Sequence, residues 1–149
     1  ALEISKEGVV QCPNNPESHM GLGIINIRLE KSDQALESIS TAIHLDPLHR
    51  TNYLTLINYH YVVGDYEEAV RVFETELSDL LVVDLNKFAW CLILSSHLKI
   101  SAHATAEKLF ADIKTAFPDF SFDSLSTSNS ILPKKATEDL ISTLQMHPF

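Results

Sequence analysis

The sequence predicts an all-α protein built from antiparallel helical hairpins that repeat along the chain as a solenoid. The first observation is a spacing: Ala35 and Ala69 lie 34 residues apart and Ala106 follows 37 residues later, each near the start of a similar apolar helix. The second is the stretch from Gly64 to Leu80, which has the pattern of the turn and second helix of one hairpin. The third is the composition, because 45% apolar and 21% charged residues are typical of a folded chain.

The chain opens with a partial unit, residues 1–15. Pro13 precedes Pro47 by 34 residues, so we expect the second helix of a truncated unit here and a C-terminal fragment of a longer protein. Residues 16–49 form the first complete unit, which Pro47 closes because proline cannot continue a helix. Its second helix is expected to begin at Ser32, whose hydroxyl can accept a hydrogen bond from a first-turn backbone N–H.

The second unit, residues 50–86, is three residues longer than the others. Asp65 and Glu68 are spaced as a capping box at the start of its second helix. A leucine, Leu81, stands where proline ends the other units. We therefore expect the second helix of this unit, or the first helix of the next, to be longer by most of a turn.

The third unit covers residues 87–120, and a change of pattern follows it. The serine-rich residues 121–130 indicate a linker or an ordered loop. Pro133 then opens a helix over 134–146 whose apolar residues fall on one stripe. We expect residues 121–149 to form a loop and a helix that caps the stack, since terminal units of a solenoid need a modified outer face. The whole chain is then a single domain.

The units resemble tetratricopeptide repeats, 34-residue helix-turn-helix units with the pattern Trp-x2-Leu-Gly-x2-Tyr, then Ala-x3-Phe, then Pro. The matching residues are Leu22 and Gly23 in the first unit, Leu56, Ala69 and Phe73 in the second, and Trp90, Ala106, Phe110 and Pro118 in the third. The Tyr position departs from the pattern, because Asn26, His60 and His97 occupy it. The resemblance implies a tetratricopeptide-type α-solenoid that binds a protein or peptide on the concave face lined by the first helices.

Composition argues against several other functions. A net charge of −9 with only 11 Lys and Arg is unsuited to a nucleic-acid surface, which needs clustered cations. Apolar runs such as Leu80 to Val83, which Asp84 ends, are far too short for a membrane span, so we expect no membrane association. Cys12 and Cys91 are too few and too far apart for a disulfide framework and indicate reduced thiols in a cytoplasmic protein.

No catalytic, cofactor or metal site is indicated. His60 and His97 occupy equivalent repeat positions and are interpreted as packed side chains, while His44 and His49 lack a partnered Cys or a carboxylate cluster at metal-ligand spacing. The chain has four Gly, and neither a phosphate-binding loop nor a Gly-x-Ser-x-Gly nucleophile motif occurs. We therefore expect a protein that is not an enzyme.

The concave face is the expected binding site for a partner. The resemblance places the following residues on it: Met20, Ile24, Ile27, Arg28, Leu54, Asn58, Tyr61, Phe88, Cys91 and Leu98. This mainly apolar set suits an amphipathic helix or apolar peptide better than an acidic tail of the Hsp90 type. Two alternatives stay open. Either a partner protein occupies the face, or the face is covered by the helix over 134–146 or, through self-association, by a second copy of the chain.

The tail narrows the predicted function. Residues 117–125 and 138–144 resemble the segment that closes the repeat region in some bacterial signalling proteins, including winged-helix transcription regulators of the HilA and CadC type and class III adenylate cyclases. The resemblance implies the C-terminal regulatory domain of a bacterial transcriptional regulator. The alternative is an accessory oligomerisation or sensing domain of an enzyme such as an adenylate cyclase.

Overall fold

The computed structural model of the chain describes residues 1–80, 84–122, 125 and 131–149. These residues contain eight helices and no strand, which confirms the predicted all-α class. The helices are α1 (Leu2–Gln11), α2 (Pro16–Arg28), α3 (Ser32–Leu45), α4 (Arg50–Val63), α5 (Tyr66–Glu76), α6 (Lys87–Lys99), α7 (His103–Ala116) and α8 (Lys134–Met146). Within the described segments, no helix is both long enough and apolar enough to cross a membrane.

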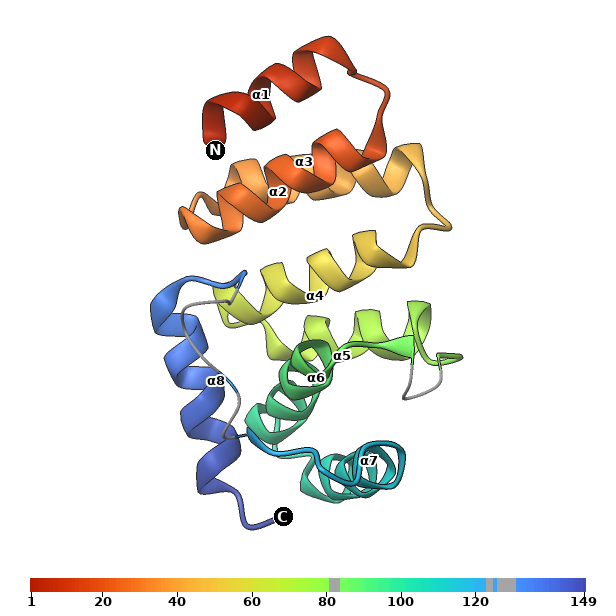
Figure 1. The fold of residues 1–149 in the computed structure, drawn as a ribbon, viewed down its shortest axis with the longest axis vertical. Coiled ribbons are helices and arrows are strands. Elements are labelled where there is room, and N and C mark those ends of the chain that lie inside the picture. The colour runs from red at the N-terminus through yellow and green to blue at the C-terminus, as the bar shows by residue number, and fades with distance from the viewer. Residues whose placement is uncertain (81–83, 123–124, 126–130) are drawn as a thin grey trace.

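Helices that are neighbours in sequence are also neighbours in space. Each helix from α1 to α7 packs against the next, and Figure 1 shows this succession from the N-terminus at one end to α7 at the other. The first helices of successive pairs also touch, α2 with α4 and α4 with α6. Ala35, Ala69 and Ala106 are at most 1% exposed, as expected where two helices approach too closely for a larger side chain.

One turn conformation recurs after α2, α4 and α6. The residue that follows each helix closely has a positive φ: Glu30 at 55°, Gly64 at 83° and Ser101 at 61°. At each turn the backbone N–H of this residue donates to the carbonyl three residues before it. The N–H of the next residue donates to the carbonyl five residues before itself, and all these hydrogen bonds are 2.9–3.2 Å long. Glycine adopts this left-handed conformation without penalty, whereas the Cβ of Glu30 and Ser101 crowds the backbone.

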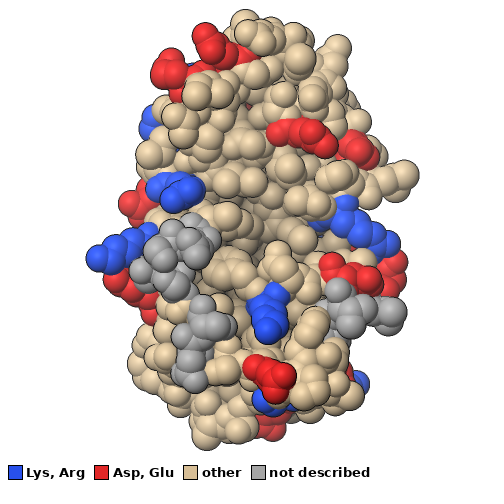
Figure 2. Space-filling view, in the orientation of Figure 1, with Lys and Arg blue, Asp and Glu red and all other residues tan. Residues whose placement is uncertain are grey.

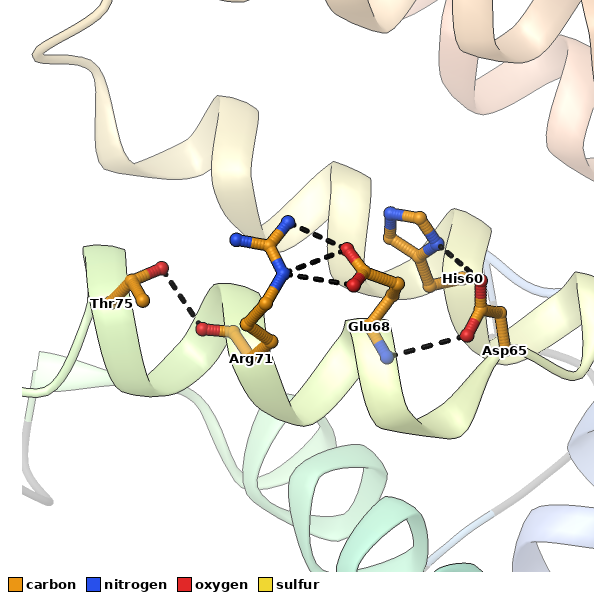
Figure 3. Close-up of polar contacts among 5 residues, drawn as sticks. All are labelled: His60, Asp65, Glu68, Arg71 and Thr75. Atoms are coloured by element: carbon orange, nitrogen blue, oxygen red, sulfur yellow. Dashed lines mark hydrogen bonds and ion pairs between the residues drawn. The ribbon is translucent and has the colours of Figure 1, made fainter.

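α5, the second helix of its pair, has a side-chain cap at its start (Figure 3). The Asp65 carboxylate accepts a hydrogen bond from the Glu68 backbone N–H at 3.4 Å. A complete capping box would also have the Glu68 carboxylate accept a hydrogen bond from the Asp65 backbone N–H. That bond is absent, because the Glu68 carboxylate instead accepts hydrogen bonds of 2.6–2.9 Å from the Arg71 guanidinium. α3 begins at Ser32 as predicted, but the predicted cap by the Ser32 hydroxyl is wrong, because the capping position belongs to Lys31, whose ammonium cannot accept a hydrogen bond.

The helices beside the additional residues of the second unit are not lengthened. α5 has 11 residues and α6 has 13, whereas α3 and α7 have 14 each, so this prediction is wrong. α5 ends at Glu76, and Leu77 turns into the core, where it is fully buried. Leu81 lies outside the described residues, as does most of the predicted linker over 121–130.

The apolar core is concentrated in the C-terminal half of the chain. One large cluster joins α4 through α8, and a small one joins α2 and α3, whereas α1 contributes no buried residue. α8 has the predicted bounds, but it does not cap the end of the stack. It lies beside α6 instead (Figure 1), because Leu140 and Leu144 pack into the large cluster.

Candidate partner-binding surface

The first helices of the three pairs carry the ten predicted binding residues. Met20, Ile24, Ile27 and Arg28 lie on α2, Leu54, Asn58 and Tyr61 on α4, and Phe88, Cys91 and Leu98 on α6. Within each helix they recur at intervals that bring them to a shared side of a 3.6-residue helix. We call this side of α2, α4 and α6 the inner face.

Burial divides the ten residues into two groups. Ile27, Asn58, Tyr61, Cys91 and Leu98 are at most 8% exposed. Met20, Ile24, Leu54 and Phe88 are half-buried, and Arg28 is exposed. A buried side chain offers an incoming partner almost no contact area, so the first group supports the fold and the second defines the accessible surface.

α8 covers the inner face of α6 through a polar contact centred on Asp139. One carboxylate oxygen of Asp139 accepts a hydrogen bond from Lys99 Nζ at 2.7 Å, and the other accepts one from Tyr61 Oη at 3.2 Å. The single hydroxyl proton of Tyr61 is thereby used, so the Ser95 hydroxyl, 2.8 Å away, donates to the Tyr61 oxygen. Burial, assisted by the Asp139 carboxylate, raises the pKa of Tyr61 well above 10.0, which keeps its hydroxyl neutral and able to donate.

Two leucines fix α8 on this face. Leu140 and Leu144 are at most 1% exposed and belong to the same core cluster as Cys91 and Leu98. Fully burying one leucine stabilises the folded state by ~1.5–3 kcal/mol, so exposing both would cost about 3–6 kcal/mol. α8 is therefore a fixed part of the fold, and the chain's own helix covers the predicted binding face at the end of α6 that carries Leu98 and Lys99.

The inner face of α2 and α4 is left accessible. Met20 and Ile24 are half-buried and pack into neither core cluster. Gly21 lies beside them, and a Cβ added there would meet no atom within 4 Å. Figure 2 shows an uncharged surface over the middle of these two helices, with charged residues at their ends. Where α4 meets α8, this surface leads into a hollow of about 270 Å³ lined by Val62 and Tyr66 among others.

Several features of this site had no signal in the sequence. Asp139 lies 78 residues from Tyr61, and an acidic residue on an amphipathic helix is ordinarily solvated. Gly21 looked like any helical glycine, and only the packing shows that the space beside it is empty. Among the described residues, no group of three or more His, Cys, Asp or Glu side chains is placed to hold a metal ion.

Fold and surface together define an all-helical domain with an accessible apolar face, and comparison with known proteins is consistent with that class. No protein-family model matches the chain. The chain is similar to the human protein DnaJ homolog subfamily C member 7, with 33% identity over 78 residues. The match includes 50% of this chain but only 16% of that protein, so the chain spans a small part of its relative. The comparison gives no support to the predicted likeness to bacterial transcription regulators or adenylate cyclases.

Proposed function

We propose that the chain is a non-catalytic protein-interaction domain of the tetratricopeptide type, and that its partner binds over α2 and α4. The observation that carries the proposal is the accessible apolar surface at Met20 and Ile24, which lies outside both core clusters. Apolar side chains gathered on one accessible face, with charges at its rim, are typical of recognition surfaces. The recurring left-handed turn and the similarity to a DnaJ homolog are compatible with a tetratricopeptide-like fold.

The partner that fits this surface is an amphipathic helix or a short apolar segment of another protein. A helix laid in a groove is recognised through apolar residues spaced along one side, which the surface over Ile24 and Leu54 can contact. A nucleic acid is a poor match, since the chain has a net charge of −9 and the middle of the face is uncharged.

The narrower functions predicted from the tail remain predictions. They are the regulatory domain of a bacterial transcriptional regulator and the accessory domain of an enzyme such as an adenylate cyclase. Self-association through the same face also remains a prediction. Sedimentation velocity tests it, because a chain that stays monomeric at high micromolar concentration is not dimerised by this surface.

The proposal is tested by selecting helical peptides against the chain and measuring how the inner-face variant Ile24→Glu changes their affinity. A library of displayed amphipathic helices supplies the ligands, and calorimetry with the purified 149-residue chain gives each dissociation constant. Glutamate maintains helix propensity at Ile24 but places a charge in the apolar contact. We expect binding to weaken at least tenfold.

A matched control comes from the opposite helix of the same pair. Leu36 on α3 is 38% exposed, so Leu36→Glu introduces the same charge on a neighbouring helix away from the inner face. Binding should be unchanged in Leu36→Glu. Equal affinities for wild type and Ile24→Glu would show that partners do not use this surface.

A further inference from the structure

One helix of the chain, α8, is already bound against the inner face of α6, and we call the site that holds it the seat. Lys99 of α6 holds the Asp139 carboxylate of α8 at 2.7 Å, and Ser95, one turn earlier on α6, is hydrogen-bonded to Tyr61, which donates to the same carboxylate. The next residue of α8, Leu140, and Leu144 one turn further supply the apolar contact, and both are buried. α8 therefore shows one way in which a helix can bind this face. Its carboxylate pairs with a lysine of α6, and leucines follow one and five residues after the acidic residue.

The recurring turn shows which residues of α2 correspond to this seat. Lys99 lies two residues before the left-handed Ser101, and Arg28 lies two residues before the left-handed Glu30. By the same register Ile24 of α2 corresponds to Ser95 of α6. The equivalent seat on α2 thus has a cation in the same place and a more apolar floor.

Unlike Lys99, Arg28 has no ion-pair partner among the residues that the structure describes. Arg28 is exposed, and in the part of the chain that the structure describes no carboxylate oxygen lies within 4.0 Å of its guanidinium. The nearest charges in sequence are those of Glu30, which lines the hollow beside α8, and Lys31. A guanidinium presents paired N–H donors that match the two oxygens of a carboxylate, so this position is suited to bind one.

We propose that the partner's helix seats on α2 as α8 seats on α6, and that it carries a carboxylate for Arg28 with apolar residues one and five positions later. This inference rests on the proposed function and specifies its ligand. The apolar residues contact Met20 and Ile24, and the carboxylate fixes the register of the helix along the face. An amphipathic helix without the acidic residue would bind less tightly and without a fixed register.

The test uses a synthetic peptide with the sequence of residues 131–147, which contains α8, as the probe. Its fluorescein-labelled form is titrated with the 149-residue chain, and anisotropy gives the dissociation constant. A second peptide carries the change Asp139→Asn. The protein variants are Arg28→Gln, Ile24→Glu and the control Lys31→Gln, which removes an equal charge three residues from Arg28.

We expect Arg28→Gln to weaken binding of the Asp-containing peptide about fivefold, as for a partly solvated ion pair, and to leave the Asn-containing peptide unaffected. Lys31→Gln should change the dissociation constant of neither peptide by more than about twofold, since this variant loses only a screened long-range attraction. If Ile24→Glu abolishes binding while Arg28→Gln has no effect, the carboxylate contact is refuted and the proposed binding face stands. Failure of the peptide to bind wild type, or binding that ignores Ile24→Glu, refutes the seat on α2.

Discussion

Two glycines on α2 provide a direct test of how the helices pack. A Cβ added at Gly23 would lie 2.8 Å from Ile39 Cγ1 and 3.6 Å from the Ala35 carbonyl oxygen, whereas a Cβ added at Gly21 would meet nothing within 4 Å. Because both glycines are inside one helix, replacing either by alanine gains the same helix propensity, about 1 kcal/mol. The difference between Gly21→Ala and Gly23→Ala therefore isolates the packing between α2 and α3.

Ile39 is 1% exposed and has little room to move, so Gly23→Ala should overpack the contact by about 1–3 kcal/mol. Gly21→Ala should be more stable than wild type by roughly 0.5–1 kcal/mol, and Gly23→Ala should lie below Gly21→Ala by the overpacking energy. Urea denaturation followed by circular dichroism measures both free energies of unfolding. Equal stabilities for the two variants would show that α2 does not present Gly23 to α3, and the assignment of the inner face would fail with it.

Three further outcomes are expected. Glu30→Gly and Ser101→Gly should each raise the free energy of unfolding by about 1 kcal/mol, since both residues hold a left-handed conformation; a loss of stability would contradict the turn geometry. Burial lowers the pKa of His60 below 6.5, so the unfolded chain takes up the proton first and stability falls as the pH drops below 6.5; His60→Phe should flatten the dependence of stability on pH between 7.5 and 5.5. Burial raises the pKa of Cys91 to about 12, so iodoacetamide should label only Cys12 in the native chain and both thiols in urea.

The helices were largely predictable from the sequence because their signals are local. Proline at 47 and alanines at 35, 69 and 106 mark where helices end and where they approach one another, and α8 has the bounds that its apolar stripe and Pro133 predict. The left-handed turn was visible only at Gly64. At Glu30 and Ser101 the same conformation is imposed by packing of the adjoining helices against the residue's own preference, so composition does not reveal it.

The position of α8 could not be predicted because an amphipathic stripe indicates that one face is buried and not what buries it. The contacts that decide its place, Asp139 with Tyr61 and with Lys99, join residues 78 and 40 apart in sequence. As a result, the predicted binding set included Cys91 and Leu98, which α8 and the core bury. Half of the inner face is thus structural, and the accessible half is smaller than the repeat pattern indicates.

The most direct test of the account is a methyl NMR titration of the chain with a selected helical peptide. If the partner binds over α2 and α4, the methyl signals of Met20, Ile24 and Leu54 should shift on binding. The signals of Leu140 and Leu144, which α8 buries in the core, should stay in place because α8 is not displaced. Large shifts at these two leucines with none at Met20 and Ile24 would contradict the account, since the partner would then replace α8 on α6.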